Sequence, residues 1–471
     1  MSAAENDFDY DVVVIGGGSA GYAAARTAVA EGLKVAVVEG GREVGGLCIL
    51  RGCMPTKALL YASEVLHLAQ HSQAFGVRSG EITFDFAAIM QRKNRLIKEF
   101  SDYRTQQLNA GHFKFIRANA TFVDPHTIQL SDGHSIRSKH FVLATGSVVA
   151  PCSITQLCEV GYITSDEALS LDKLPKSLII LGGGAVAVEF AQFFNRLGVR
   201  VTLVQRSEHL LKEEETDAAI ELEKVFRREG MTVFTGTHLT HAWREGGLKG
   251  VAFEYEGQPV RVAAEEILFA LGRIPNTANL ALDKAGVQMS YGRFPANSKM
   301  QTSAKHIFAA GDCTGLHEIV HIAIQQGEFA AWNIAHPTAM KTIDYRLASS
   351  VVFTEPQLGR VGLTEKFAKA EKIPYLAASH PFCDHGKSMT MEALDGFVKL
   401  LADPGTGEII GGTCLGPSGG ELIHEIIAAM HKRMTVHELA AMPHYHPTLA
   451  EIWTYPAEEL AGKIPRKEII S

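Results

Sequence analysis

The 471-residue sequence lacks the features that mark secreted, membrane-spanning or nucleic-acid-binding proteins. Its seven cysteines are few and odd in number, which excludes a secreted disulfide scaffold. No apolar stretch approaches the ~20 residues that span a bilayer, and the acidic start MSAAENDFDY has no export-signal pattern. The net charge of −7 arises without long runs of one sign, so no basic nucleic-acid-binding face is expected. We therefore predict a cytoplasmic protein with no membrane or nucleic-acid partner.

The composition is that of a folded, multidomain chain. Hydrophobic residues make up 46% and charged residues 21%, which excludes a largely disordered protein. At roughly 100–200 residues per domain, the length indicates about three domains.

Two segments of the chain repeat one pattern. Residues 10–39 and 178–206 each read as an apolar β-branched strand, three glycines, a helix and a second strand. Continuous apolar strands of this kind suit a parallel sheet that is covered on both faces. The offset from Gly16 to Glu39 equals that from Gly182 to Gln205, namely 23 positions, which predicts two doubly wound dinucleotide-binding domains in an α/β fold.

Further strands surround these units. The segments 140–147 (HFVLATGS) and 266–273 (EILFALGR) each run into a glycine, and 301–314 adds a buried strand that ends at Gly311-Asp312. Asp132-Gly133 predicts a tight hairpin turn. After about residue 345, short strands and two helical runs predict a separate C-terminal α+β domain.

The first glycine turn predicts a dinucleotide site. Gly16, Gly18 and Gly21 fit G-x-G-x-x-G, where the glycines allow a tight turn, close approach of a pyrophosphate and close helix–strand packing. The helix N-terminus then offers N–H groups to the phosphates. Glu39 ends the following strand, where a carboxylate can accept hydrogen bonds from ribose hydroxyls.

The second glycine turn differs at its key positions. Gly182, Gly184 and Ala187 form the G-x-G-x-x-A variant, and Gln205-Arg206 stands where the first unit has its acid. An arginine there can accommodate a 2′-phosphate, which favours NADPH over NADH. The alternative is that Arg206 is an ordinary solvated loop residue.

Cys48 and Cys53 lie in the segment GGLCILRGCMPTK at 45–57. In a regular helix their Cα atoms would be roughly 8.5–9 Å apart, whereas a disulfide needs about 4.4–6.8 Å. A bridge therefore requires an irregular turn, which Gly45, Gly46 and Gly52 can provide. A thiol at the start of the following helix would have its thiolate favoured by the helix dipole. Buried thiols and metal ligands remain alternatives from these residues alone.

The ordered motifs together resemble the class I pyridine nucleotide–disulfide oxidoreductases, a family that includes dihydrolipoamide dehydrogenases, glutathione reductases and mercuric reductases. The resemblance covers nearly the whole chain, and the motifs that carry it are the two glycine turns, the Cys48–Cys53 segment, ATG at 144–146, GRIPN at 272–276, AAGD at 309–312 and HPTLAE at 446–451. It implies FAD at the first turn and NAD(P)H at the second. It also implies an FAD-binding domain at 1–150, an NAD(P)-binding domain at 151–275, a return to the FAD-binding domain at 276–345 and a dimerisation domain at 346–471, hence a homodimer.

The resemblance also implies roles for individual residues. Cys53 would face the flavin, Cys48 would exchange with the substrate, and Lys57 and Glu189 would form a pair beside the flavin. Asp312 would bind the ribityl chain. The resemblance places the remaining cofactor contacts at Thr145, Gly146 and Gly272. His446, held by Glu451, would manage the protons of thiol–disulfide exchange, serving the disulfide of a second copy. We assign no role to His444.

The implied activity is electron relay between NAD(P)H, FAD, the Cys48–Cys53 disulfide and a small disulfide substrate, most like that of dihydrolipoamide dehydrogenase. The alternatives are an NADPH-dependent disulfide reductase, a flavin-dependent quinone reductase or oxidase, and a non-catalytic flavoprotein. Leu47 and Leu50-Arg51 depart from the usual motif, and Arg51 could favour an acidic disulfide or lower a thiol pKa. The absence of cysteine beyond Cys414 argues against mercury reduction.

The H-E-x-x-H segment and the five other cysteines are expected to have no catalytic role. His317-Glu318-Ile319-Val320-His321 fits H-E-x-x-H but is expected to bind no metal. Cys152 and Cys158 are expected to be inert thiols rather than a second redox pair. The other three cysteines, at 313, 383 and 414, have no partner within reach by sequence.

Overall fold

The computed structural model describes residues 8–290, 293 and 295–465. The chain forms two compact units. The first unit contains residues up to 58, residues 90–151 and residues 272–343; the second contains residues 59–89, residues 152–271 and the chain from 344 onward.

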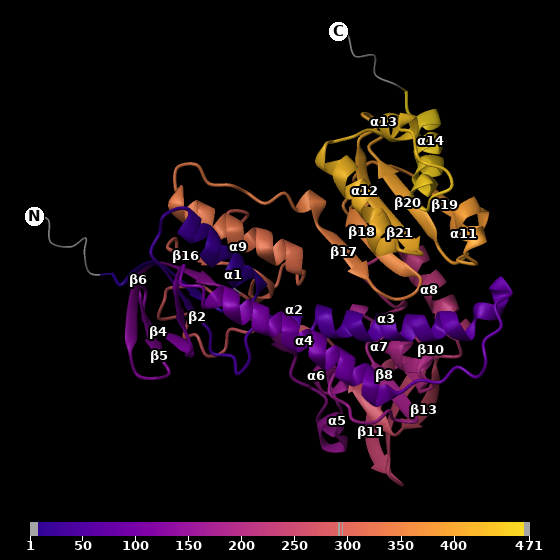
Figure 1. Ribbon diagram of the computed structural model, residues 1–471, viewed down its shortest axis with the longest axis horizontal. Helices are drawn as coiled ribbons and strands as arrows, with labels where there is room; N and C mark the ends of the chain where they lie inside the picture. The colour runs from indigo at the N-terminus through magenta and orange to yellow at the C-terminus, as the bar shows by residue number, and fades with distance from the viewer. Residues whose placement is uncertain (1–7, 291–292, 294, 466–471) are drawn as a thin grey trace, which may run out of the picture. The chain divides into compact units, whose positions relative to one another are not determined.

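A mostly parallel sheet forms the core of the first unit (Figure 1). Its strands run in the order β3-β2-β1-β6-β5-β4, with β16 beside β6. These strands are β1 (Tyr10–Ile15), β2 (Val35–Val38), β3 (Lys114–Ile116), β4 (Ala120–Asp124), β5 (Thr127–Leu130), β6 (Ser135–Leu143) and β16 (Ile307–Ala309). β1 pairs in parallel with both β2 and β6, and its residues from Val12 to Ile15 are buried because neighbours cover both faces.

Helices cover this sheet. α1 (Ser19–Ala30) follows the first glycine turn and packs closely along α9 (Val320–Ala335). Two longer helices, α3 (Cys53–Gln70) and α4 (Phe86–Leu108), begin in one unit and end in the other. β7 (Ser147–Val149) and β15 (Arg273–Pro275) form a small antiparallel pair.

The second unit contains the other doubly wound sheet, with strand order β10-β9-β8-β14. Its elements are β8 (Ser177–Leu181), α7 (Ala185–Arg196), β9 (Arg200–Val204), α8 (Thr216–Arg228), β10 (Thr232–Phe234) and β14 (Glu266–Phe269). An antiparallel meander lies between β10 and β14 in the chain, formed by β11 (His238–Glu245), β12 (Leu248–Tyr255) and β13 (Gln258–Ala264).

The C-terminal part of the second unit is an antiparallel sheet with helices, in the order β17-β18-β21-β20-β19. Its strands are β17 (Ser349–Val352), β18 (Gln357–Gly362), β19 (Leu376–Pro381), β20 (Phe397–Ala402) and β21 (Ile409–Gly416). α12 (Gly419–His431) packs on β18 and β21, and α14 (Thr454–Lys463) packs on β19 and β20. Trp453 is fully buried in this core.

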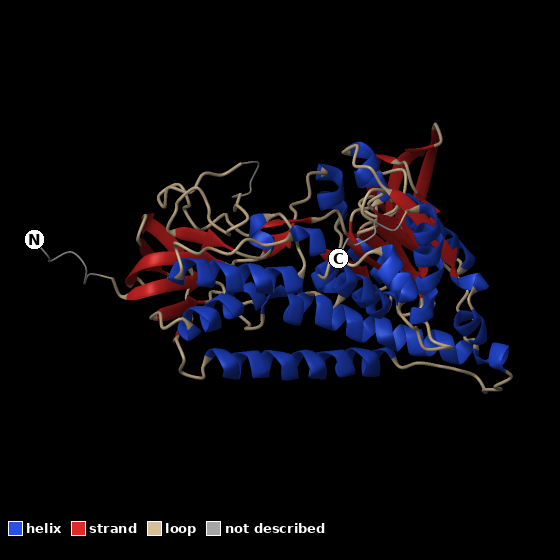
Figure 2. Cartoon of the chain, turned by 90° about the horizontal axis from the view of Figure 1, so that it is seen from above, coloured by secondary structure: helices blue, strands red, loops and turns tan. Residues whose placement is uncertain are grey.

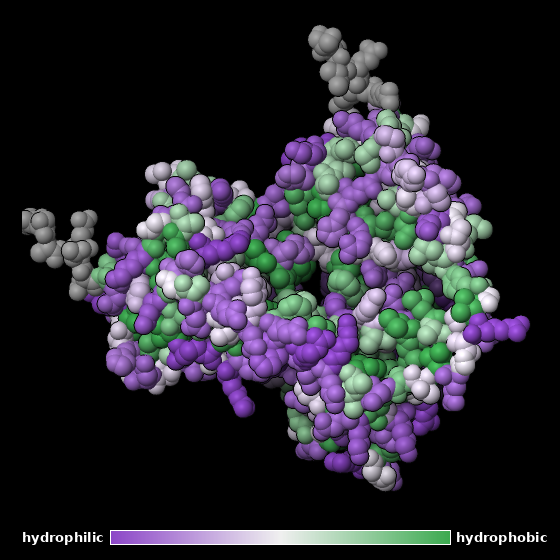
Figure 3. All heavy atoms as spheres, in the orientation of Figure 1, coloured by the Kyte–Doolittle hydropathy of each residue, from purple (hydrophilic) through white to green (hydrophobic). Residues whose placement is uncertain are grey.

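The predicted fold class is confirmed: two doubly wound α/β sheets precede an α+β region. Figure 2 shows strands flanked by helices in both units. Asp132-Gly133 does form the hairpin turn between β5 and β6, with Gly133 at a φ of +92°. Among the described residues, no helix is both long and apolar enough to cross a membrane. Figure 3 shows polar and apolar side chains interspersed on one face.

Candidate functional site

The structure brings Cys48 and Cys53 into direct contact. Cys48 lies in α2 (Gly46–Arg51), Cys53 is the first residue of α3, and Gly52 separates the two helices. Gly52 breaks the helical path, with φ −129° and ψ −113°. Both the side chain and the backbone N–H of Cys53 hydrogen-bond to the Cys48 sulfur. The irregular turn that a bridge requires is therefore present.

The proton on Cys48 is held tightly. The hydrogen bond with the Cys53 side chain raises the pKa of Cys48 strongly, and burial raises it further. The charge of Lys57, one helical turn into α3, lowers that pKa and so acts in the opposite direction. A negative charge on Cys53 disfavours loss of the Cys48 proton, whereas the positive charge of Lys57 favours it.

Arg51 is the last residue of the same short helix. Its guanidinium forms an ion pair with Glu43 at 3.1 Å, and both side chains are about half exposed. The suggested effect of Arg51 on a thiol pKa or on an acidic substrate stays a prediction.

The first glycine turn has the geometry of a cradle for phosphate. A Cβ on Gly16 would lie 2.2 Å from the Ala144 carbonyl oxygen, and one on Gly21 would lie 1.8 Å from the Gly16 carbonyl oxygen. Gly18 precedes α1, whose first N–H groups have no side-chain cap. The Glu39 carboxylate accepts hydrogen bonds from the N–H of Gly17 at 2.8 Å and of Gly41 at 2.6 Å, so it is fixed beside the turn.

Arg104 is a residue beside this turn that sequence reasoning missed. Its guanidinium lies over the ring of Tyr22, 4.4 Å from the centroid, and its charge interacts with Cys48. Burial lowers the pKa of Arg104. Within the described chain, no acceptor reaches its buried Nε and Nη1 atoms. A buried guanidinium with unused N–H groups beside a phosphate cradle fits an anionic group.

A second cluster in the first unit gathers three predicted positions. Asp312 accepts a hydrogen bond from the Ser147 hydroxyl at 2.8 Å, directly after Thr145 and Gly146. Gly146 has a φ of +70°, and among the described residues nothing partners the buried Thr145 hydroxyl.

Gly272 connects to the same cluster. It has a φ of +114°, and its carbonyl accepts from the N–H of Ala150 at 3.0 Å. Arg273 follows it and donates to the Ser147 hydroxyl at 2.9 Å. The unpartnered Thr145 hydroxyl and the aligned Asp312 carboxylate fit a polar chain such as the ribityl of FAD.

The second glycine turn lies in the second unit. A Cβ on Gly182 would lie 2.4 Å from the Ala270 carbonyl oxygen, whereas one on Gly184 would meet nothing within 4 Å. Ala187 is buried in α7. The Gln205 side chain accepts from the backbone N–H of Arg206 at 3.1 Å, and the Arg206 side chain is exposed. Gln205 stands where the first unit has Glu39, a carboxylate that would repel a 2′-phosphate. The exposed Arg206 beside it is a cation that can accommodate one.

Glu189 lies in α7 and is buried, accepting a hydrogen bond from the backbone N–H of Phe353 at 2.9 Å. Lys57 belongs to the first unit and Glu189 to the second, and their pairing stays a prediction.

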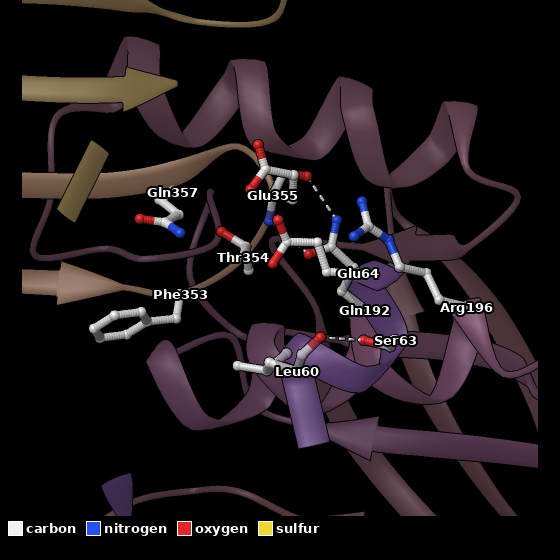
Figure 4. Close-up of a pocket in the computed structure, with 9 residues that line it drawn as sticks. All are labelled: Leu60, Ser63, Glu64, Gln192, Arg196, Phe353, Thr354, Glu355 and Gln357. Atoms are coloured by element: carbon white, nitrogen blue, oxygen red, sulfur yellow. Dashed lines mark hydrogen bonds between the residues drawn. The ribbon is translucent and has the colours of Figure 1, made fainter. Parts of the chain in front are cut away.

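One turn further along α7, Gln192 borders a cavity of about 20 Å³, room for roughly one water (Figure 4). Gln192 exchanges hydrogen bonds with the backbone of Glu355 at 2.7 Å. Burial, reinforced by the charge of Glu64, raises the pKa of Glu355 to about 7.

His446 and Glu451 form a dyad in the C-terminal region. His446 Nδ1 lies 2.9 Å from Glu451 Oε2, which leaves Nε2 as the outward nitrogen of a side chain that is 77% exposed. Glu451 itself is buried.

His385 approaches Glu451 from the other side and was missed by sequence reasoning. It is fully buried, its Nε2 lies 3.4 Å from Glu451 Oε1, and its Nδ1 lies 2.8 Å from the Ser388 hydroxyl. Burial lowers the pKa of His385. No local sequence signal marks His385, because it lies far from HPTLAE in the chain.

His444 also contacts a carboxylate, but its side chain is largely buried, whereas that of His446 is exposed. Its Nε2 lies 2.6 Å from Glu425 Oε1, and its side chain is only 6% exposed. A buried histidine in an ion pair is typical of a structural contact.

The H-E-x-x-H segment is not a helical zinc motif here. α9 begins at Val320, so His317 precedes the helix that contains His321. In the described ranges, no group of three His, Cys, Asp or Glu side chains could hold a metal.

Comparison with known proteins identifies the family. The sequence profile described as "Pyridine nucleotide-disulphide oxidoreductase" matches residues 10–327, and that of the family's dimerisation domain matches residues 348–457. The chain belongs to this family.

Its relatives within the family have several names. A mercuric reductase of Staphylococcus aureus is 34% identical over 94% of this chain and 81% of its own length. A dihydrolipoyl dehydrogenase of Geobacillus stearothermophilus is 33% identical over 96% of both chains. Two solved structures are also similar: LpdA from Mycobacterium tuberculosis, at 28% identity and a TM-score of 0.85, and the HOCl-induced flavoprotein disulfide reductase RclA from Escherichia coli, at 26% and 0.83. Both matches cover 95% of this chain and 99% of the other.

Membership fixes the general chemistry. The chain is a flavin-dependent pyridine nucleotide–disulfide oxidoreductase that uses FAD and NAD(P)H, and its dimerisation domain supports a homodimer. The cradle at Gly16, the orphaned N–H groups of Arg104 and the orphaned hydroxyl of Thr145 fit FAD in the first unit.

Proposed function

We propose that this protein interconverts a small dithiol and its disulfide, with dihydrolipoamide as the first-ranked dithiol, using Cys48 and Cys53 as its working thiols. The observation that carries the proposal is the direct contact of the two sulfurs at the break between α2 and α3, beside Lys57. The Geobacillus relative, named a dihydrolipoyl dehydrogenase, matches over nearly the full length of both chains, which supports this ranking.

FAD would be held by the Gly16 turn, Glu39, Arg104, Thr145 and Asp312, and when bound it supplies two-electron exchange with NAD(P)H and with the Cys48–Cys53 pair. The domain limits predicted from the sequence, with FAD at 1–150 and 276–345, NAD(P) at 151–275 and dimerisation at 346–471, belong to this proposal.

The thiols perform the exchange in two balanced steps. The Cys48 thiolate attacks one sulfur of the substrate disulfide, forming a mixed disulfide and releasing one substrate thiolate. Cys53 then attacks the Cys48 sulfur, closing the Cys48–Cys53 bond and releasing the second thiolate. The substrate gains two electrons, and the reverse sequence oxidises a dithiol. Lys57 stabilises the thiolate form of Cys48.

His446 handles the protons in this proposal. Its outward Nε2 takes the proton that each cysteine thiol loses and returns it to the substrate thiolate released in that step, while Glu451 fixes the tautomer through Nδ1. His446 of one copy would serve the Cys48 of the other, in keeping with the homodimer. Because His385 lies against the second oxygen of Glu451, we assign it the role of a positioning residue for that carboxylate.

The test is a rapid-mixing survey of the FAD-loaded enzyme. Wild type, Cys48→Ser and His446→Gln would be mixed with lipoamide, glutathione disulfide, Hg²⁺ and a quinone, under NADH and under NADPH. We expect lipoamide turnover to fall below detection in Cys48→Ser. In His446→Gln it should fall by about 10²–10⁴-fold, the usual contribution of general acid–base catalysis.

His444→Gln is the matched control, since it removes a neighbouring histidine that is also bonded to a carboxylate. It should keep most of its turnover. Wild-type rates with lipoamide in Cys48→Ser would refute the dithiol mechanism. Faster wild-type turnover of Hg²⁺ or quinone than of lipoamide would refute the substrate ranking alone.

A second candidate is an NADPH-dependent disulfide reductase. The Gln205-Arg206 tip favours it because the exposed cation suits a 2′-phosphate. In the same survey, this candidate predicts glutathione disulfide or a related substrate ahead of lipoamide, and NADPH ahead of NADH.

A further inference from the structure

A second pair of cysteines lies outside the site described above. Cys152 is the first residue of the second unit after the chain leaves the first. Cys158 lies in the short helix α5 (Thr155–Val160), and Tyr162 follows that helix. The chain thus gathers two thiols and a phenol within eleven residues, all of them in the second unit.

The two thiols interact with each other. The Cys158 thiol lies 3.8 Å from the Cys152 carbonyl oxygen, and the Cys152 thiol lies 3.5 Å from the Ile154 carbonyl oxygen. The neighbouring Cys152 side chain is the main cause that raises the pKa of Cys158. Tyr162 interacts with both sulfurs. In the Cys48–Cys53 pair, likewise, the neighbouring cysteine side chain is the main cause of a raised thiol pKa.

Accessibility distinguishes this pair from the remaining cysteines. Cys158 is exposed and Cys152 is half-buried, so a solute can reach the pair. Cys313 and Cys414 are fully buried, and burial raises the pKa of both thiols, to about 11 for Cys313. Cys383 is exposed but forms no sulfur contact in the described chain. Reactivity toward a dissolved oxidant requires both exposure and, for an internal bond, a neighbouring sulfur.

We propose that Cys152 and Cys158 form a second dithiol–disulfide couple, which reacts with low-molecular-weight disulfides independently of the Cys48–Cys53 pair. The exposed Cys158 thiolate attacks the external disulfide, forms a mixed disulfide and releases one small thiol. Cys152 then attacks the Cys158 sulfur, forming the internal bond and releasing the second small thiol. The external disulfide gains the two electrons that the protein thiols lose, and both protons leave on the small thiols.

The internal bond would join α5 to the segment that enters the second unit. α5 has only six residues, and its N-cap residue Ile154 supplies no side-chain hydrogen bond, so its first turn is held weakly in the dithiol state. The helix packs on β11 of the meander. Closing a loop of five intervening residues restricts the freedom of this turn, so oxidation should order α5.

The experiment uses the FAD-loaded full chain in glutathione buffers of stepped oxidation, stopped with N-ethylmaleimide and digested with trypsin. Residues 140–173 emerge as one peptide, because no lysine or arginine lies between His140 and Lys173, and Cys152 and Cys158 are its only cysteines. We expect this peptide to lose two hydrogens, about 2 Da, and to take up no maleimide. Dithiothreitol should reverse the change. In the variant Cys158→Ser, Cys152 should instead carry maleimide or glutathione.

Cys383 is the internal control for exposure alone, and it should acquire glutathione without forming an internal bond. The proposal is overturned if the peptide keeps two alkylated thiols in buffers that modify Cys383, or if both of its cysteines carry glutathione. Hydrogen exchange in residues 155–160 should slow at least several-fold on oxidation, while the same treatment of Cys158→Ser leaves it unchanged. Equal hydrogen-exchange rates in the dithiol and disulfide states would show that oxidation does not order α5.

Discussion

The two glycine turns of this protein have the same backbone and different side chains. In each, a Cβ on the first glycine would collide with a carbonyl oxygen of a neighbouring strand end, at 2.2 Å for Gly16 and 2.4 Å for Gly182. In each, a helix begins three residues after that glycine. The two strand–turn–helix units therefore share the same close backbone contact at their first glycine.

The turns diverge at two positions. Gly21 packs so closely on the first turn that a Cβ would lie 1.8 Å from the Gly16 oxygen, whereas the second unit has Ala187 there. At the end of the next strand, the Glu39 carboxylate accepts a hydrogen bond from the turn, whereas the Gln205 side chain accepts one from the backbone N–H of Arg206. The comparison teaches that one backbone scaffold is used twice and that the two copies differ in a few side chains at the turn and at the end of the next strand.

The largest effect is expected from exchanging the third position of the turns. Gly21→Ala places a methyl group against backbone that cannot move aside, a cost of about 3 kcal/mol, or ~100-fold in FAD affinity. Ala187→Gly removes a buried methyl group from a helix and should cost about 1 kcal/mol of stability. The ratio of flavin to protein absorbance after gel filtration measures the first effect, and thermal unfolding the second. Equal flavin retention in both variants would contradict the proposed difference between the turns.

The next effect separates the two sites by ligand. Gly16→Ala and Gly182→Ala introduce the same clash at positive φ, +111° and +122°. Gly16→Ala should lose FAD, whereas Gly182→Ala should keep FAD and raise the KM for NADPH by ~30-fold, since overpacking costs about 2 kcal/mol. Flavin content and NADPH titration distinguish the variants. If Gly182→Ala also loses its flavin, the assignment of one ligand to each turn is wrong.

A smaller effect concerns the nicotinamide side. Arg206→Glu replaces a cation with an anion at the expected position of the 2′-phosphate. The KM for NADPH should rise by ~10-fold or more, because a charge-assisted bond contributes about 1.5–3 kcal/mol, and the KM for NADH should change little. Steady-state rates with both coenzymes give the ratio, and equal changes would refute the preference for NADPH.

The smallest effect concerns the acid of the first turn. Glu39→Gln keeps one acceptor oxygen for the Gly17 N–H but removes the charge, which should cost about 1 kcal/mol, or ~5-fold in FAD affinity. Gln205→Glu is the reciprocal change and should weaken NADPH more than NADH. Fluorescence titration of the apoprotein with FAD measures the former. A Glu39→Gln variant with unchanged affinity would show that the carboxylate serves the turn rather than the cofactor.

Much of the fold could be predicted because its signals are local. The apolar strand before each triple glycine and the helix after it appear in the sequence pattern, and β1, α1, β8 and α7 lie where that pattern puts them. The resemblance implies that the chain returns to the first unit near residue 276, but the assignment of residues 59–89 to the second unit could not be predicted. It depends on long helices such as α3, which begins in one unit and ends in the other. The apolar periodicity of a helix does not indicate which unit its end packs in.

The candidate site divides in the same way. Cys48 and Cys53, or His446 and Glu451, are close in sequence, so spacing and backbone chemistry can relate them. His385 and Arg104 could not be found in this manner, since tertiary packing alone brings the first to Glu451 and the second to Tyr22 and Cys48. Cys152 and Cys158 are expected from the sequence to be inert thiols, so their contact was not predicted although they are near neighbours. Their contact depends on an irregular segment before α5 for which no sequence pattern exists.

The pairing of β16 with β6 has a consequence for biosynthesis. A ribosome that has completed Leu143 must still add more residues than it has already joined before Ile307 emerges to complete that sheet. At typical synthesis rates this takes on the order of ten seconds or more. Throughout that interval β6 has an open edge, so the nascent chain would be most vulnerable to aggregation before its flavin-binding half can close.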